Sequence, residues 1–172
     1  TLSLIKGCDR PAISLLSRLD QEGHLLDFRF VPSLIRVQEQ LTYEYVNEVY
    51  DRNPLLFHLY EFAKKLRQKR VEGGGLVLSM PEAVIQVEPG ASVSVQLVDQ
   101  DSPSRMMVAE LMILYNRLAA MFCRENRIPA LYRSQEPPSE VLPRGEGSYA
   151  YYVFKQRRKL NPDDANLRVF KP

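Results

Sequence analysis

The chain has 172 residues, of which 45% are hydrophobic and 26% are charged. This is the composition of an ordinary globular protein, and the length is enough to bury the core of one domain. It excludes a disordered tail, a collagen-like repeat and a disulfide-rich scaffold. The 23 Lys and Arg residues nearly balance the 21 Asp and Glu residues, which leaves a net charge of +2. Any basic surface that binds nucleic acid must therefore be local.

The cysteine positions and the most apolar stretch indicate whether to expect disulfides, a membrane span and a particular cellular compartment. Cys8 and Cys123 are far apart in the sequence, so we expect two free thiols with no disulfide partner. The most apolar stretch, residues 106–122, is interrupted by Glu110 and Arg117, which favours a buried helix over a membrane span. We expect no membrane partner, and a cytoplasmic protein, with an organelle as the alternative. Both ends of the chain are interpreted as cuts within a longer protein.

Two strands are predicted near the N-terminus. Residues 12–19 are predicted to form the first strand, and a turn follows at residues 21–23. Leu26, Phe28 and Phe30 alternate with charged residues, which predicts a second strand antiparallel to the first.

Two helices are predicted to follow these strands. Thr42 is a suitable N-cap for a short helix that ends near Tyr50. Pro54 suits the first position of a longer helix, which the glycines at 73–75 bring to an end. Four apolar residues recur at the helical period and are expected to form its buried face: Leu55, Leu59, Phe62 and Leu66.

The middle of the chain is predicted to return to strands. Residues 76–78 are apolar and are interpreted as a short strand. Residues 83–87 and 93–97 flank the turn sequence Glu-Pro-Gly at 88–90, which predicts a β-hairpin.

The last third is predicted to begin with a long helix over residues 102–125. Residues 129–147 are rich in Pro and Gly and are interpreted as a loop, and residues 161–164 as a turn. Five residues of the long helix are expected to face inward: Met107, Leu111, Leu114, Leu118 and Phe122. This order of elements predicts an α+β fold, with mostly antiparallel strands and packed helices, rather than a parallel doubly wound sheet.

The residue types that carry most catalytic chemistry are sparse. His24 and His58 are the two histidines, and with two distant cysteines they offer no zinc spacing. Cys123 with a histidine would be a nucleophile and base, but buried, inert thiols are far commoner than reactive ones.

Paired carboxylates are the alternative, because metal-dependent phosphodiester chemistry needs several clustered Asp or Glu oxygens. Asp99 with Asp101, and Asp163 with Asp164, are the candidate pairs. Turns and helix capping explain both pairs better. No catalytic residue and no metal ligand is therefore assigned within this chain.

Two segments are locally basic. Residues 64–70 hold five Lys or Arg, and residues 149–159 hold four aromatic residues followed by four basic ones. Cations for phosphates and rings for bases are what a groove for single-stranded nucleic acid requires. The alternative, which composition alone favours, is a solvated helix face beside core aromatics.

Five groups of short motifs lie in a fixed order along the chain. They are LSLI at 2–5 with DRPAIS at 9–14; LTYE at 41–44; LRQKR at 66–70 with the glycine run at 73–75 into Leu76 and MPEA at 80–83; VAELMILYN at 108–116; and IPALYR at 128–133 with EPP at 136–138. Together they resemble the ribonuclease II/ribonuclease R family. Order and spacing agree across nearly the whole chain, so the combination is specific although each motif is weak.

The resemblance implies that residues 1–172 are a single, partial RNB catalytic domain. It implies a parent enzyme that uses Mg²⁺ to degrade single-stranded RNA from the 3′ end to nucleoside monophosphates. The family's catalytic Asp cluster would lie before Thr1 and its phosphate-binding arginine after Pro172, so this chain alone is expected to be inactive. The alternatives are a catalytically inactive RNB-like module that binds RNA, and an unrelated α+β scaffold with a basic face.

Three positions depart from the family pattern. Leu78 stands where many members have a phenylalanine that stacks on the 3′-terminal bases. Ala109 replaces the first glutamate of a helical pair, which leaves Glu110 alone, and Gln135 replaces a common histidine. These departures indicate a divergent branch of the family.

Six residues are predicted to contact RNA: Leu78, Arg105, Glu110, Arg133, Arg157 and Arg158. The first four lie in or beside the family motifs. For Glu110 and Arg133 the alternative is a mutual or surface ion pair.

Arg157 and Arg158 are expected to line the approach to the RNA channel. The alternative is that both side chains only keep a surface helix solvated, or form ion pairs with acidic residues such as Asp163.

Overall fold

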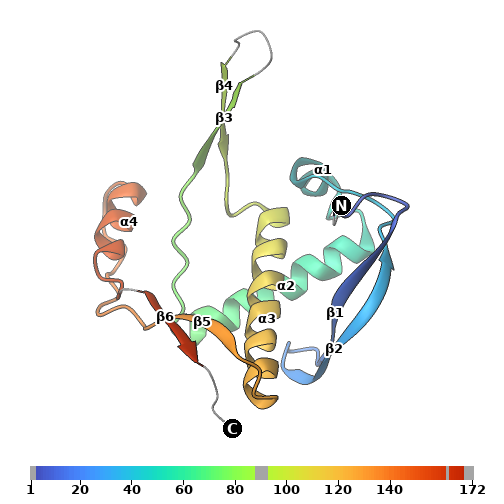
Figure 1. The fold of residues 1–172 in the computed structure, drawn as a ribbon. Coiled ribbons are helices and arrows are strands. Elements are labelled where there is room, and N and C mark those ends of the chain that lie inside the picture. Colours follow the sequence, from blue (N-terminus) through green and yellow to red (C-terminus); the bar gives the residue numbers. More distant parts are fainter. Residues whose placement is uncertain (1–2, 88–92, 162, 169–172) are drawn as a thin grey trace. The chain divides into compact units, whose positions relative to one another are not determined.

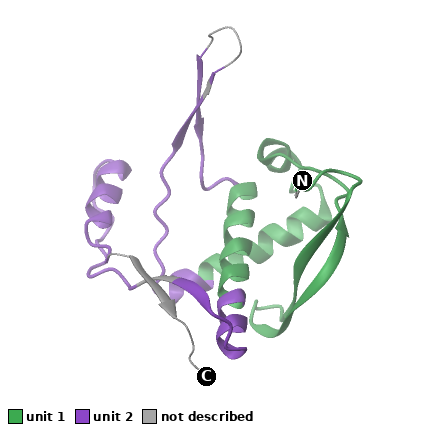
Figure 2. Ribbon diagram, viewed as in Figure 1, with its two compact units in different colours: residues 1–68, 103–118 green, residues 69–102, 119–172 purple. Residues whose placement is uncertain are grey.

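A computed structural model describes residues 3–87, 93–161 and 163–168. Contacts divide the chain into two compact units, residues 1–68 with 103–118 and residues 69–102 with 119–172 (Figure 2). Among the described residues, helices combine with three separate antiparallel strand pairs (Figure 1). The predicted α+β class is confirmed.

The first unit contains the predicted N-terminal strand pair. β1 (Asp9–Leu19) and β2 (Leu25–Arg36) are antiparallel and are both longer than predicted. At the end away from the turn, an ion pair joins the two strands, with 2.6 Å between Arg36 Nε and Asp9 Oδ1. Hydrogen bonding to the Asp9 carboxylate raises the pKa of Arg36. At the other end Gly23 is buried in the turn with a φ of +78°, a conformation that favours glycine.

Both predicted helices of this unit begin where their capping residues lie. α1 (Tyr43–Val49) follows Thr42, whose hydroxyl accepts a hydrogen bond from the Tyr45 N–H at 3.2 Å. α2 (Pro54–Glu72) follows Asn53, whose side-chain oxygen accepts from two N–H groups of the first turn at 3.0 and 3.2 Å. These side chains satisfy backbone donors that have no partner within the helix.

The core of the first unit joins three helices. Val46 of α1, Ala63 of α2 and Met107 of α3 (Pro103–Glu125) are buried together. The prediction for α2 is wrong at Leu55, which is 70% exposed. The α2 residues that pack on this core begin at Leu56 instead of Leu55 and follow the helical spacing i, i+3 and i+4: Leu56, Leu59 and Tyr60. Tyr50, the C-cap of α1, packs on the same core.

α3 has the predicted bounds and buries one of its faces. Met107 and Leu118 are buried as predicted, and Met106 and Glu110 are buried beside them. The helix is long and apolar enough to cross a membrane by length and composition. Core helices of soluble proteins meet the same criterion, so the expectation of no membrane partner stays a prediction.

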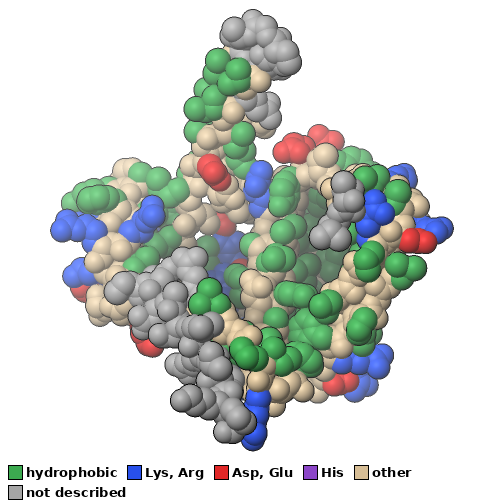
Figure 3. All heavy atoms as spheres, in the orientation of Figure 1, with side chains coloured by type: hydrophobic (Ala, Val, Ile, Leu, Met, Phe, Trp, Pro, Cys, Tyr) green, Lys and Arg blue, Asp and Glu red, His purple; other side chains and the backbone are tan. Residues whose placement is uncertain are grey.

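The first two strands of the second unit form the predicted hairpin. β3 (Glu82–Val87) pairs with β4 (Val93–Val98) in the register Glu82↔Val98. Its predicted turn lies at residues outside the described part. The strand predicted at residues 76–78 is absent, because this segment has no pairing partner among the described residues. Along the hairpin, apolar side chains gather at the surface (Figure 3).

Another strand pair of this unit was not predicted. β5 (Ala130–Gln135) runs antiparallel to β6 (Asp163–Arg168), so the prediction of a loop over 129–147 and a turn at 161–164 is wrong in part. The two strands are far apart in the sequence. In neither strand do apolar and polar residues alternate clearly enough to predict a strand. α4 (Tyr149–Arg157) lies between them in sequence.

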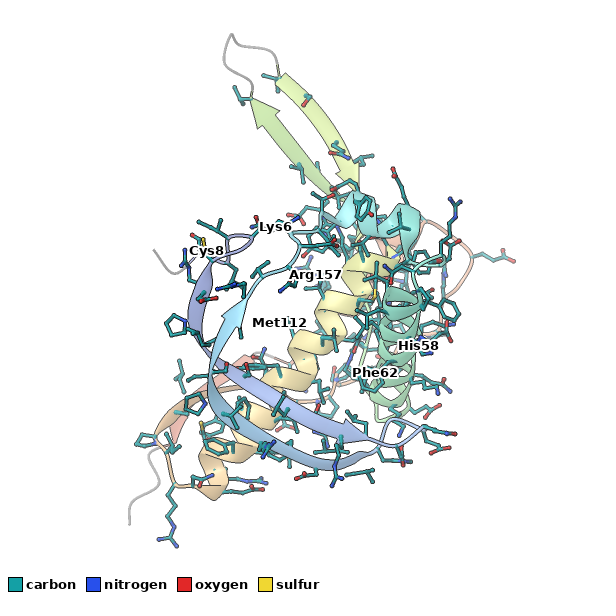
Figure 4. All side chains as sticks on the ribbon, turned by 90° about the vertical axis from the view of Figure 1, so that its right-hand side faces the viewer. Lys6, Cys8, His58, Phe62, Met112 and Arg157 are labelled. Atoms are coloured by element: carbon teal, nitrogen blue, oxygen red, sulfur yellow. The ribbon has the colours of Figure 1, made fainter. Side chains whose placement is uncertain are left out.

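Both thiols are free in this structure. Cys8 lies just before β1 (Figure 4), and Cys123 lies in the last turn of α3.

Candidate functional site

A pocket of about 560 Å³ lies within the second unit. Three segments form it: the end of α2 with the residues that follow, the residues after β5, and Leu160 after α4 (Tyr149–Arg157). Its lining residues are Arg70, Gly73, Gly74, Gly75, Leu76, Leu78, Glu136, Pro137, Pro138 and Leu160. The fold therefore brings together two motifs of the ribonuclease resemblance, the glycine run with Leu78 and the Glu-Pro-Pro sequence.

The glycines shape the pocket by ending α2 in a sharp reversal. The N–H of Gly75 donates to the carbonyl of Arg70 at 2.8 Å, and the N–H of Gly74 donates to the carbonyl of Val71 at 2.9 Å. These two bonds form a Schellman motif, in which the residue after the C-cap adopts a left-handed conformation. Gly74 has the required φ of +91°. The reversal carries the following residues, among them Leu78, along the pocket wall.

Gly75 is needed for a different reason, because its Cα lies too close to the end of α2 to carry a side chain. A Cβ at this position would lie 2.8 Å from the Arg70 carbonyl oxygen, a backbone atom that cannot move without breaking the helix end. We expect Gly75→Ala and Gly74→Ala each to lower the free energy of unfolding by about 1 kcal/mol or more. Gly145→Ala is the matched control, because a Cβ there meets nothing within 4 Å.

Chemical denaturation of the three variants measures these free energies. Equal stability of Gly75→Ala and Gly145→Ala would contradict the close approach.

The segment that follows the Glu-Pro-Pro wall of the pocket is held by α4. Gln156 is fully buried, and its side-chain oxygen accepts from the Leu142 N–H at 2.7 Å while its amide donates to the Glu140 carbonyl at 2.8 Å. The sequence reasoning missed this residue. Its position three residues after the buried Val153 was the available signal, because it places a polar side chain on the inward face.

Three further hydrogen bonds tie the Glu-Pro-Pro motif and the serine after it to the segment that follows α4. The backbone N–H and the hydroxyl of Ser139 both donate to the Lys159 carbonyl, at 2.9 and 3.0 Å. The Asn161 side-chain amide donates to the Pro137 carbonyl at 2.6 Å. This wall is therefore positioned by side chains that the motif itself does not contain.

The lining of the pocket suits binding rather than catalysis. Its charged residues are Arg70 and Glu136, and the rest of the lining is apolar or glycine backbone. An arginine can bind a phosphate oxygen, and leucine and proline side chains can contact the face of a base. One carboxylate is too few to hold a catalytic divalent ion, so the pocket does not fit a magnesium site.

Two predicted RNA-contact residues lie in the first unit, both on α3. The guanidinium of Arg105 lies over the ring of Tyr43, with its carbon 4.3 Å from the ring centroid. Glu110 is only 4% exposed, so this residue is buried within the fold rather than at its surface.

The other four lie in the second unit. Leu78 lines the pocket, while Arg157 and Arg158 are exposed at the C-terminal end of α4 and are not among the lining residues. Arg133 lies on β5, and its side chain is outside the described part. The structure thus places one of these four at the pocket, and the RNA contacts of all six stay predictions.

Of the acidic groups near one another in sequence, Asp163 and Asp164 lie on β6 rather than in the predicted turn, and their side chains are outside the described part. The other acidic groups belong to turns. Asp99 accepts a hydrogen bond from the Asp101 N–H at 2.9 Å, as expected of a turn before a helix. Between β1 and β2, potential ligand atoms of Asp20, Glu22 and His24 lie within 4.8 Å of one another. The Asp20 carboxylate already bonds the backbone N–H of His24 at 2.7 Å and its ring nitrogen at 2.8 Å. This contact closes the turn.

Comparison with known proteins shows that the chain is similar to parts of ribonucleases. The family model for the RNB domain matches residues 1–145. An uncharacterized ribonuclease of Synechocystis sp. is 38% identical over 141 residues, which cover 80% of this chain and 21% of that protein. Ribonuclease R of Chlamydia pneumoniae is 26% identical over 144 residues, with the same two coverages of 80% and 21%. The chain thus spans about a fifth of the length of these relatives.

Solved structures share the fold. RNase R of Mycoplasma genitalium, in complex with ribose-methylated single-stranded RNA, superposes with a TM-score of 0.75 at 16% identity, covering 95% of this chain and 32% of that one. The Dss1 exoribonuclease of Candida glabrata superposes with a TM-score of 0.70 at 21% identity, covering 94% of this chain and 24% of that one. The predicted family resemblance is confirmed.

Proposed function

Because the chain belongs to the RNB domain family, we propose that the full-length protein is an exoribonuclease that degrades single-stranded RNA from its 3′ end to nucleoside monophosphates. The relatives named above are ribonucleases, and one solved relative holds single-stranded RNA. The observation that carries the proposal for this chain is the pocket, where the glycine run, Leu78 and the Glu-Pro-Pro motif meet.

Within this activity, the pocket is proposed to hold nucleotides of the bound strand. Arg70 would bind a phosphate, and Leu78 with Pro137 would contact a base. The glycines would let the strand approach the backbone closely, because they carry no side chain.

Magnesium is proposed as the cofactor of the full-length protein, with its ligands outside residues 1–172. The family resemblance supports this proposal. Among the described residues, the pocket offers Glu136 as its single carboxylate, so no catalytic step is assigned to this chain.

The test uses the full-length protein and two preparations of a single-stranded RNA, one labelled at its 5′ end and one labelled at every nucleotide. We expect Mg²⁺-dependent shortening from the 3′ end with release of nucleoside monophosphates, and no reaction when the metal is chelated. Binding of the RNA without any product, at all Mg²⁺ concentrations, would favour the alternative of an inactive RNA-binding module.

Leu78→Phe tests the pocket as a base-binding site. A phenyl ring stacks on a base where leucine gives only apolar contact, and stacking contributes ~1–3 kcal/mol per base, so we expect binding about fivefold tighter or more. Leu131→Phe is the control, because Leu131 is 71% exposed on β5 and does not line the pocket.

Affinity for single-stranded RNA and the length of the final products of the full-length protein are the measurements. Unchanged values in Leu78→Phe would argue against a base contact at this position.

A further inference from the structure

The outward face of α4 carries an ordered set of aromatic and basic side chains. Tyr151, Phe154, Lys155 and Arg158 are spaced i, i+3, i+4 and i+7, which places them on one side of the helix. Tyr151 is 58% exposed and Phe154 is 59% exposed, and both basic residues are exposed. Large aromatic side chains are normally covered, so two of them on one exposed helix face indicate a surface that binds something.

Each ring on this face is paired with a cation one turn further along the helix. The Lys155 Nζ lies 4.9 Å from the Tyr151 ring centroid, and the guanidinium carbon of Arg158 lies 6.0 Å from the Phe154 ring centroid. Such pairs place a positive charge at each ring. The result is two ring–cation pairs in succession along about two turns.

The opposite face of α4 fixes the helix within the second unit. Val153 is 2% exposed and Gln156 is fully buried. Tyr149 and Tyr152 stack with a centroid separation of 6.0 Å, and Arg144 lies 5.0 Å from the Tyr149 centroid. The exposed rings therefore stand on a helix whose inward side is packed and hydrogen-bonded, so binding would cost little ordering of the backbone.

Charge decides which kind of partner this face suits. α4 contains no acidic residue and carries Lys155 and Arg157, with Arg158 as its C-cap. Basic and hydrophobic side chains lie next to one another over the helix (Figure 3). A hydrophobic protein partner would leave these cations desolvated and unpaired, whereas a nucleic acid strand supplies both phosphates and flat bases.

We infer that the face formed by Tyr151, Phe154, Lys155 and Arg158 is a base-stacking site for single-stranded RNA. The rings would stack on two bases, and Lys155 and Arg158 would pair with the phosphates beside them. None of these four residues lines the Leu78 pocket, so this is a separate contact with the strand. The inference rests on the proposed function for the identity of the ligand.

The test measures RNA affinity of the full-length protein with Mg²⁺ chelated, so that no degradation occurs during binding. Tyr151→Ala/Phe154→Ala is compared with Tyr151→Phe/Phe154→Tyr, which keeps both rings. Tyr45→Ala is the matched control, because Tyr45 is a 51% exposed tyrosine on α1 and no cation of the described residues lies over its ring. The probes are a fluorescent single-stranded oligoribonucleotide and the same strand with an internal run of abasic positions.

Loss of both rings should weaken binding of the intact strand about fivefold or more, while the ring-preserving variant and Tyr45→Ala bind as the unaltered protein does. Abasic positions should weaken binding to the unaltered protein and have a smaller effect on the ringless variant. The salt dependence should separate the two kinds of contact. Arg157→Ala/Arg158→Ala should flatten the slope of log affinity against log salt by ~1–2 units, and loss of the rings should leave it unchanged.

Equal affinity of the ringless and unaltered proteins, with equal sensitivity to abasic positions, would overturn the inference. If light scattering then showed that loss of the rings changes the molecular mass, the face would be assigned to a second copy of the protein. Nuclease activity with Mg²⁺ restored is measured separately. Ring-dependent binding without degradation would overturn the proposed exoribonuclease activity and leave the stacking site in place.

Discussion

The 172-residue chain, purified by itself, should release no nucleoside monophosphates from single-stranded RNA in the presence of Mg²⁺. Metal-dependent hydrolysis of a phosphodiester needs several carboxylates around the scissile phosphate. The pocket has one, Glu136, and the described cluster of Asp20, Glu22 and His24 belongs to a turn in the other unit. From the family resemblance we propose that the catalytic Asp cluster and the phosphate-binding arginine lie outside residues 1–172.

The full-length protein, assayed beside the chain on the same labelled RNA, provides the reference. Circular dichroism must first show that the isolated chain has its helices, so that inactivity is not caused by unfolding. Release of nucleoside monophosphates by the folded chain, above the level of a chelated control, would contradict the prediction. It would also mean that the carboxylates of residues 1–172 suffice for catalysis.

Replacing Gln156 by Leu should lower the free energy of unfolding by about 1–3 kcal/mol, because it removes two hydrogen bonds that each contribute about 0.5–1.5 kcal/mol. These are the bonds of the Gln156 side chain to the Leu142 N–H and to the Glu140 carbonyl. The same bonds hold the segment after the Glu-Pro-Pro motif, so RNA binding at the pocket should weaken as well.

Gln38→Leu is the matched control, because Gln38 is exposed and follows β2. Chemical denaturation of both variants gives the two free energies. A loss below about 0.5 kcal/mol for Gln156→Leu, within the range of surface substitutions, would show that the buried amide does not hold this wall.

The sequence was most informative where the signal is local. Thr42 and Pro54 mark helix starts because a capping hydroxyl and a fixed φ act within one turn, and the structure confirms both. The glycines at 73–75 end α2 for the same kind of reason, a left-handed residue after the helix. The hairpin of β3 and β4 needed only its alternating residues and a turn sequence between them.

The sequence was wrong where structure depends on a distant partner. β5 and β6 pair across the whole of α4, and the loop-like composition of residues 129–147 hid the first of them. On α2 the apolar period allowed two neighbouring faces, and packing against Val46 and Met107 selected the one without Leu55. Periodicity shows that a helix has an apolar face, but only its neighbours decide which residues are covered.

The candidate site shows the same difference between what the sequence predicts and what only the tertiary structure decides. The order of motifs along the chain was sufficient to indicate the RNB family and to single out Leu78, because family motifs are read residue by residue. Only the tertiary structure placed Leu78 in one pocket with Arg70 and the Glu-Pro-Pro segment, and showed that Gln156 holds the residues that follow this segment. These contacts join residues distant in sequence, and side-chain hydrogen bonds across such distances leave no periodic signal in the chain.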